Sequence, residues 1–579
     1  MESNFSKKEK YIQNGVFLVL MAISAVFLIW KCQYGFANVD ESLYVAIPYR
    51  ILQGDGLFIH EWNLSSLSSF LLMPIIWLYM AIVGTTEGIL LNFRYIFVAV
   101  QALTALFLYF KLKRYNWIGA VVAAISFFIY APFSITALSY NSVGIQCVAV
   151  AAVIVMTNES GKKADFVIAG VLFAASVLCC PFLVVGYLVY TIAVVVNIFK
   201  KFCTTQKILQ KEGWFWITAG ISILAVLFLI FVLSRAGISD ILTALTYMLN
   251  DPQHKSQSVF SVFSKYIKGV LICNSISIYI FAAFAVLIAF YIVLKYKKSY
   301  KAVFFCIGCV LTGLLMMPFV TWQFYINYVM FPVNILGLFC VIISENKVVK
   351  KLFAYLWIPG FVYGICIHFA STEGFLNIAS VSSISLLASI IIVVMVGKEV
   401  LCDVSNKPLQ ILVSAAVVCV LAMQVITVGY TRYVSVFWES GSFGGGMHTQ
   451  TQRLSDGPEK GILASAEKEK MYNMFMEDIA PITKENSPEN ILYISQNTWL
   501  YLASENSRNS SFSPWLPGKN EQEMQNTVER LLKYLELNPD KMPDVIFVEE
   551  KYNDAAKKMT DKLGFSGEKT KNGNYIYKR

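Results

Sequence analysis

Two adjacent carboxylates, Asp40 and Glu41, lie about ten residues beyond the first long apolar run of the chain. That run, residues 11–30, is long enough to cross a bilayer, so the pair is expected near the polar boundary on the far side. The phosphate of a lipid carrier would lie at the same depth. A carboxylate placed there can take a proton from an acceptor beside a lipid-linked substrate. The pair therefore predicts general-base chemistry at a membrane surface, with helix capping as the structural alternative.

The elements predicted next would hold this pair at the membrane surface. Residues 42–52 can form a short amphipathic helix along the interface, which Gly54 to Gly56 would end. The next apolar run, 67–84, is long enough to cross, but a crossing would place the basic cluster at 111–114 and every later cluster outside. The positive-inside rule therefore predicts that 67–84 dips into the outer interface without crossing.

Apolar runs of membrane-spanning length recur to about residue 428 in a chain that is 57% hydrophobic and 15% charged. The basic N-terminus is expected in the cytoplasm, in a multi-pass protein of the cell membrane. The net charge of +10 then belongs mostly to the cytoplasmic rim, and no nucleic-acid partner is expected. The thirteen predicted crossings are 11–30, 90–110, 117–135, 142–157, 165–180, 182–199, 214–234, 266–294, 302–319, 324–343, 352–369, 376–396 and 409–428.

The predicted fold class is an all-α polytopic membrane protein with a C-terminal extracytoplasmic α/β domain. A membrane module, 1–430, contains the first outer loop, 31–66; a glycine-rich linker, 431–446, leads to the domain, 447–579. In that domain 491–495, 545–548 and 574–577 are typical of strands, and 526–537 and 552–563 of helices. It has no phosphate-binding glycine loop and no metal-ligand spacing, so a substrate-shaping or structural role is expected.

Further polar residues fall at the outer ends of the predicted crossings. Ionisable groups at such depths are costly and often functional. The alternatives are snorkelling for the arginine, an aromatic belt for the tyrosines, and solvated loops for the rest. These candidates are His60, Glu61, Arg94, Tyr140, Asn141, His254, Lys255 and Tyr325.

The first outer loop resembles that of the GT-C glycosyltransferases. The similarity rests on the Asp-Glu pair, Tyr44, Arg50 and the Gly-Asp-Gly of 54–56. The protein O-mannosyltransferases and the lipid A aminoarabinose transferase are the most similar families. In them a carboxylate of this loop is the catalytic residue, and an acidic residue followed by Lys-Pro precedes the interfacial helix. This chain has His60-Glu61-Trp62 there, with no lysine after it.

The resemblance implies a GT-C fold and a role for each candidate. Asp40 would be the catalytic base, with Glu41 beside it. The donor phosphate would be bound by Arg94, His254, Lys255 and Tyr325. The substrate would be bound by His60, Glu61, Tyr140 and Asn141.

The expected activity is that of a hexosyl- or pentosyltransferase that uses a polyprenyl-phosphate sugar. The acceptor would be an envelope glycolipid, a surface polysaccharide or a protein. A single displacement with one base would invert the anomeric centre. The sequence indicates no particular cofactor, and Asp40, Glu61 and His254 could together hold a divalent metal ion. Two alternatives remain: an envelope polysaccharide ligase or polymerase, and a flippase or transporter without chemistry.

Overall fold

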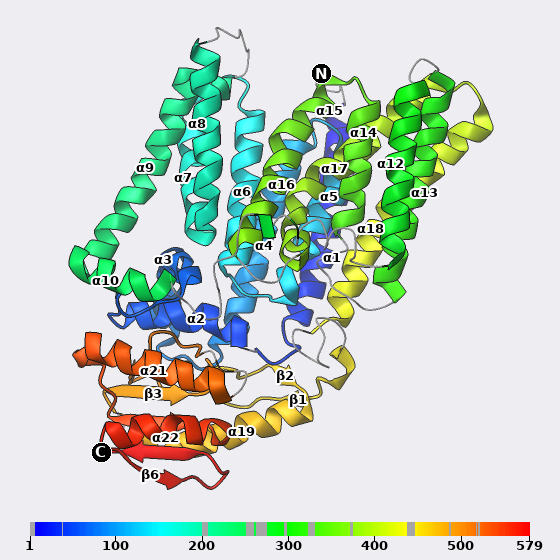
Figure 1. The fold of residues 1–579 in the computed structure, drawn as a ribbon. Helices are drawn as coiled ribbons and strands as arrows, with labels where there is room; N and C mark the ends of the chain where they lie inside the picture. The colour runs from blue at the N-terminus through cyan, green and yellow to red at the C-terminus, as the bar shows by residue number, and fades with distance from the viewer. Residues whose placement is uncertain are drawn as a thin grey trace.

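The computed structural model describes residues 6–37, 39–199, 207–249, 260–261, 264, 275–294, 298–321, 330–370, 375–436, 446–485, 488–516, 518 and 521–579. Long helices form a bundle, and a smaller domain that carries the strands lies against one end of it (Figure 1). The N-terminal end of the chain lies at the opposite end of the molecule from the C-terminus (Figure 1).

The helices of the bundle follow the apolar runs of the sequence. Each of the thirteen predicted crossings overlaps one of them. Among the described residues, ten helical segments are long and apolar enough to cross a membrane, and one is 65–83, which was predicted not to cross. The count of thirteen therefore stays a prediction. The bundle contains α1 (Lys7–Lys31), α4 (Ile89–Leu112), α5 (Trp117–Ile129), α6 (Tyr140–Thr157), α7 (Lys163–Cys179), α8 (Val184–Phe199), α9 (Lys211–Leu233), α12 (Ser275–Leu294), α13 (Lys298–Thr321), α14 (Phe331–Ile343), α15 (Lys347–Leu352), α16 (Ile358–Ala370), α17 (Phe375–Asp403) and α18 (Lys407–Val434).

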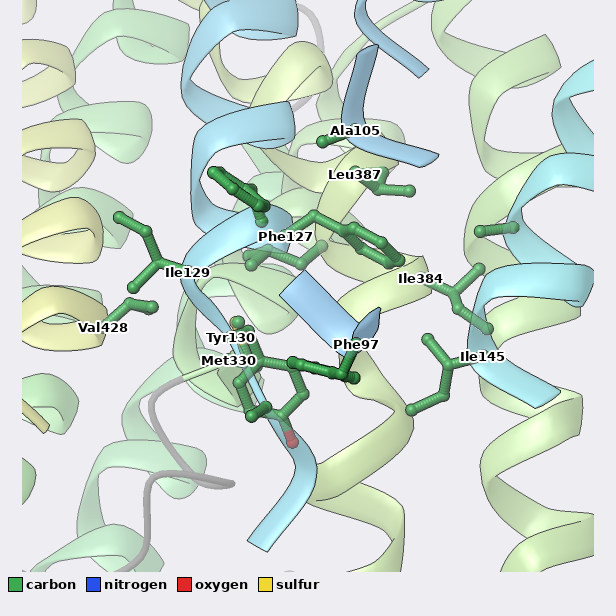
Figure 2. Close-up of a cluster of buried hydrophobic side chains, with 14 of the residues drawn as sticks. Phe97, Ala105, Phe127, Ile129, Tyr130, Ile145, Met330, Ile384, Leu387 and Val428 are labelled. Carbon is green, nitrogen blue, oxygen red and sulfur yellow. The ribbon is translucent and has the colours of Figure 1, made fainter. Parts of the chain in front are cut away.

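An apolar core around α5 and α17 lies at the centre of the bundle. Figure 2 shows Phe97 of α4, Phe127 of α5, Ile145 of α6 and Leu387 of α17 gathered there, and all four are buried. Lipid tails are as apolar as these side chains, so helix association in a membrane depends on close packing. α5 and α17 are buried along most of their length, so they form the centre of the bundle. The end of the bundle that carries the C-terminal domain is called the outer end below (Figure 1).

Short helices lie between the bundle and the strand-containing domain (Figure 1). They include α2 (Val39–Leu52) and α10 (Ile238–Leu249), and η1 (Leu64–Ser68) leads into α3 (Ser69–Val83), which packs against α2. α2 begins at Val39 rather than at residue 42, so both carboxylates lie in its first turn. Residues 41–51 are all buried, because the C-terminal domain covers the side that was expected to face the interface.

The C-terminal domain has the predicted α/β architecture. Its sheet has the order β4–β3–β5–β7–β6; β3 is parallel to β4 and β5, and β7 is antiparallel to β5 and β6. Alternate residues point to opposite faces, so Leu492 and Ile546 pack with α21 and α22, whereas Tyr493 and Phe547 pack on the α19 side. The elements are β1 (Gln452–Arg453), β2 (Leu463–Ala464), α19 (Ala466–Ala480), β3 (Asn490–Ile494), α20 (Leu500–Ala503), β4 (Arg508–Asn509), α21 (Glu521–Leu537), β5 (Val545–Val548), α22 (Asn553–Lys562), β6 (Ser566–Lys569) and β7 (Tyr575–Lys578).

Backbone hydrogen bonds join this domain to the first outer loop. The amide of Gly35 donates to the carbonyl of Leu463 at 2.8 Å, and that of Trp62 donates to the carbonyl of Phe512 at 2.8 Å. The domain is therefore fastened to the outer end of the bundle through contacts distant in sequence. Residues 437–445 of the predicted linker lie outside the described residues.

α7 and α9 approach each other at two glycines. A Cβ atom added to Gly170 would lie 2.2 Å from the carbonyl oxygen of Ile217, and one added to Gly220 would lie 2.1 Å from that of Val167. Both opposing atoms are backbone atoms, which cannot move aside as a side chain can. These glycines therefore set the distance between the two helices.

We expect Gly220→Ala to separate α7 from α9 and to lower Tm in detergent, because overpacking costs about 1–3 kcal/mol. This outweighs the gain in helix propensity of about 1 kcal/mol. Gly429→Ala in α18 is the matched control, since no atom of the described chain lies within 4 Å of its added Cβ. Equal Tm changes in the two variants would contradict this packing.

Candidate active site

Glu41 and Arg94 form a buried ion pair at the outer end of the bundle. Arg94 Nε and Nη2 donate to the two carboxylate oxygens of Glu41 at 2.5 and 2.8 Å. Its Nη1 donates to the carbonyls of Cys32 at 2.8 Å and Tyr34 at 3.4 Å, and Nη2 donates to that of Gly35 at 2.7 Å. All five N–H groups of the guanidinium thus meet acceptors. The contact fastens α2 and α4 to the turn that follows α1.

This pairing gives both residues a positioning role that the sequence analysis did not predict. Arg94 is 2% exposed and Glu41 is 3% exposed. A donor phosphate could reach Arg94 only by displacing the carboxylate or the carbonyls. The geometry therefore does not favour the predicted phosphate contact of Arg94 or a catalytic role for Glu41. Opposite charges that share a buried site satisfy each other, because either one alone would carry a large desolvation cost.

Asp40, one residue earlier, points in a different direction. Successive residues of an α-helix are rotated by about 100°, and half-buried Asp40 interacts with Tyr44 of α2 and Tyr140 at the start of α6. The two tyrosine rings meet edge to face, with centroids 5.6 Å apart. Burial raises the pKa of Tyr44 well above its ordinary value, and Tyr140 and the Asp40 carboxylate raise it further. The structure thus brings Asp40 and Tyr140 together, with buried Asn141 next in α6.

The connection between α5 and α6 forms one side of this cluster and has an unusual backbone. Phe133, at φ 56°, packs with Tyr44 and Tyr140, and the next residue, Ser134, has φ 62°. Non-glycine residues in the left-handed region cost about 1–3 kcal/mol each and persist only where the surroundings enforce them. Such strain concentrates at ligand-binding and active sites.

Glu61 and His60 lie at the other end of α2. Arg50, in the last turn, donates to Glu61 at 3.0 Å and to Asp55 at 2.6 Å. Asp40 and Arg50 are ten residues apart, which corresponds to about 15 Å along a helix. The position of His60 and Glu61 therefore does not support the predicted substrate contact beside Asp40. These residues are therefore near Asp40 in the sequence but not in space, because the length of α2 separates its two ends.

This second cluster of charges joins the outer loop to the C-terminal domain. Lys541 forms a buried ion pair with Asp55, and Arg50 Nη2 donates to the carbonyl of Ser511 at 3.0 Å. Two cations and two carboxylates, the second being Glu61, thus meet between domains. The cluster holds the C-terminal end of α2, as Arg94 holds the N-terminal end.

No three His, Cys, Asp or Glu side chains are grouped to hold a metal ion within the described part of the chain. Of the predicted metal ligands, Asp40 and Glu61 lie at opposite ends of α2, so one ion cannot bind both. His254 lies outside the described residues, and so do Lys255 and Tyr325. Their predicted contacts with a metal ion or with the donor phosphate stay predictions.

Two cations that the sequence analysis did not single out lie beside the Glu41–Arg94 pair. Lys31 ends α1 and Arg432 lies in the last turn of α18, and both line a small cavity together with Arg94. Each is 2% exposed. A signal for them exists in the sequence: basic residues at the outer ends of the first and last crossings run against the positive-inside rule.

Comparison with known proteins finds similarity in structure only. No protein-family model and no curated protein sequence matches the chain. The oligosaccharyltransferase AglB of Archaeoglobus fulgidus, solved with an inhibitory peptide and a dolichol-phosphate, is similar over 99% of this chain and 74% of its own, at 11% identity and a TM-score of 0.46. ArnT of Cupriavidus metallidurans, bound to undecaprenyl phosphate, is similar over 99% of this chain and 98% of its own, at 11% identity and a TM-score of 0.44.

Both proteins are GT-C glycosyltransferases, the superfamily that the first outer loop resembles. An oligosaccharyltransferase of Archaeoglobus fulgidus that is tethered to an acceptor peptide gives a TM-score of 0.47 at 11% identity, over 97% of this chain and 74% of its own. TM-scores below 0.5 do not by themselves assign an activity. The proposed function therefore rests on the side chains of this chain.

We expect Arg94→Met to destabilise the protein by about 3–5 kcal/mol, because it leaves the Glu41 carboxylate buried without a partner. The double variant with Glu41→Gln should recover part of this loss. Lys460→Met removes an exposed pair with Glu87 and should cost less than about 1 kcal/mol. Tm in detergent measures all three, and a double variant as unstable as the sum of the two single variants would contradict the pairing.

The cluster at the other end of α2 predicts two opposed pH dependences. Burial raises the pKa of Glu61 from 4.5 to about 7, so its stabilising contribution is complete below pH 4.5 and is lost as the pH rises through 7. Burial lowers the pKa of His60 from 6.5 to about 4, so its contribution is lost as the pH falls from 6.5 to 4. Each effect amounts to about 3 kcal/mol.

In the wild type these effects nearly cancel between pH 6.5 and 4.5. We therefore expect Glu61→Gln to lose stability on acidification and His60→Asn to gain it, each relative to wild type. Tm recorded against pH in detergent tests this. Curves that stay parallel to the wild-type curve for both variants would contradict the assigned shifts.

Proposed function

We propose that this chain is a membrane glycosyltransferase that moves a sugar from a polyprenyl-phosphate donor to an extracytoplasmic acceptor, with Asp40 as general base. The observation that carries the proposal is the placement of Asp40. Its carboxylate is half buried at the outer end of the bundle beside Tyr44 and Tyr140, and the Glu41–Arg94 pair fixes its helix. A base is needed where a lipid-linked donor presents its head group, and the place of this residue at the outer end of the bundle supports that role.

The chemistry needs few groups from the protein. The acceptor oxygen or nitrogen forms a bond to the anomeric carbon as the bond between that carbon and the phosphate oxygen breaks. Asp40 takes the acceptor proton, and the lipid phosphate leaves as an anion, so no general acid is required. A single displacement inverts the anomeric centre. Tyr44, kept protonated by burial, can donate a hydrogen bond that orients the carboxylate or a substrate hydroxyl.

The rest of the site divides into positioning groups and substrate contacts. Glu41 and Arg94 act through Asp40 by holding the first turn of α2. Tyr140, which interacts with Asp40, and Asn141, which follows it in α6, remain the proposed contacts with the sugar or the acceptor. His254, Lys255 and Tyr325 remain proposed phosphate contacts. Envelope glycolipid, surface polysaccharide and protein remain the candidate acceptors.

We expect Asp40→Asn to lower transfer about 100- to 10,000-fold, the usual contribution of a general base. The assay uses the purified chain in nanodiscs, radiolabelled polyprenyl-phosphate sugars and an acceptor-containing membrane extract. Asp240→Asn, an exposed acid in the first turn of α10, is the matched control and should retain wild-type turnover. Tm should stay close to the wild-type value in both variants.

The outcomes separate the rival functions. Equal turnover in Asp40→Asn and wild type would remove Asp40 from the mechanism. Turnover with lipid diphosphate donors only would favour a ligase or polymerase. Movement of a lipid-linked glycan across the nanodisc or vesicle membrane without transfer would favour a flippase.

A further inference from the structure

A second feature of the outer end, the cavity beside the Glu41–Arg94 pair, is lined by three basic side chains and by one carboxylate. Lys31, Arg94 and Arg432 line it, together with Glu41, Ser134 and Thr136. Both oxygens of the Glu41 carboxylate accept hydrogen bonds from Arg94. Lys31 and Arg432 thus lie in the wall without a carboxylate partner among the described residues.

The hydrogen bonds of the two remaining cations are weak or go to neutral atoms. Lys31 Nζ donates to the carbonyl of Tyr433 at 3.0 Å and contacts the sulfur of Met447 at 3.0 Å. Arg432 Nη1 reaches the carbonyl of Ser134 at only 3.5 Å, and its Nε has no partner within the described part of the chain. The hydroxyl of Ser134 is likewise buried without a described partner. Two unsatisfied polar groups therefore line one cavity.

Another nearby carboxyl group does not supply the missing negative charge. Glu459 of the C-terminal domain is fully buried, and one of its oxygens accepts from the amide of Ala37 at 3.1 Å. Burial raises the pKa of Glu459 well above its ordinary value, which disfavours its charged form. Buried charges without partners are strongly unfavourable unless another group compensates them.

The donor set matches one class of anion. A guanidinium presents N–H groups in a planar fork, an ammonium adds a point charge, and a hydroxyl adds a further donor, which together suit the oxygens of a phosphate group. Ser134 also holds φ 62°, a strained conformation of the kind that persists at ligand sites. We propose that Lys31, Arg432 and Ser134 form a binding site for a phosphate group.

The position of this site relates it to Asp40. Along the connection before α6, Phe133 and Ile135 pack with Tyr44, beside which Asp40 lies, whereas Ser134 and Thr136 line the cavity. One strained segment thus separates the proposed base from the phosphate site. The inference rests on the proposed function where it takes the phosphate to be that of the lipid donor. The cations that bind it come from the ends of the first and last helices of the bundle.

Thermal unfolding of the purified chain in nanodiscs tests the site with three probes: undecaprenyl phosphate, inorganic phosphate and uncharged undecaprenol. We expect undecaprenyl phosphate to raise Tm and undecaprenol not to do so. A rise with inorganic phosphate that depends on Arg432 would support the site and assign a free anion as its ligand. No rise with either phosphate would overturn the proposal.

Variants separate binding from a structural role. In Arg432→Gln and in Ser134→Ala, the increase in Tm caused by undecaprenyl phosphate should be smaller, because the affinity falls at least tenfold. The Tm without ligand should be equal to or above the wild-type value. Arg432→Lys keeps the charge and should retain part of the rise. Arg453→Gln, an exposed arginine on the same side, should behave as wild type. An unchanged rise in Arg432→Gln, or a lower ligand-free Tm without any recovery in Arg432→Lys, would overturn the proposal.

Failure of this inference can be told apart from failure of the proposed function. If Asp40→Asn abolishes sugar transfer but Arg432→Gln leaves phosphate binding unchanged, the proposed function stands and only the phosphate site is wrong. If Arg432→Gln weakens phosphate binding but Asp40→Asn transfers sugar as well as wild type, the phosphate site stands and only the role of Asp40 as base is wrong.

Discussion

The guanidinium of Arg94 in α4 holds together the turn that follows α1 and the first turn of α2, which lie 53 to 62 residues earlier in the chain. Its five donors meet the carboxylate of Glu41 and three carbonyls in the turn that follows α1. A planar fork in a buried site leaves its acceptors few alternative positions. The first turn of α2 is therefore fixed against α1 and α4, and the direction of Asp40 follows from that constraint. Any chemistry assigned to Asp40 depends on it.

The C-terminal domain completes the enclosure of α2. The hydroxyl of Thr498 lies 2.6 Å from that of Ser42 and donates to the carbonyl of Val39 at 2.9 Å, while Lys541 pairs with Asp55 near the other end. Both ends of the helix are thus held by polar contacts that only a folded assembly of both domains can satisfy. The C-terminal domain therefore helps to position α2 and Asp40, which a domain without contacts to α2 would not do.

Charge is distributed unevenly over this outer region. The Arg50 cluster contains equal numbers of cations and carboxylates, whereas the cavity near α1 and α18 has Lys31 and Arg432 in excess. Paired buried charges offset one another's desolvation cost, whereas a buried charge left without a partner is strongly unfavourable unless another group compensates it. The same physical rule that assigns a structural role to Arg50 thus assigns a binding role to Arg432.

Much of the architecture could be predicted from the sequence. Long apolar runs form helices in a membrane, where the backbone must satisfy its own hydrogen bonds, and short apolar runs indicate buried strands. The helices and the α/β domain followed from local pattern, and the placement of Asp40 and Tyr140 at the same end of the bundle followed from the positions of the apolar runs. The partners of Arg94 and Glu61, and the unbalanced Lys31 and Arg432, did not. Which charges meet is decided by how the helices and loops pack, whether the partners are 11 residues apart, as Arg50 and Glu61 are, or 53, as Glu41 and Arg94 are. A one-dimensional pattern carries no information about which of several nearby opposite charges a buried group will reach.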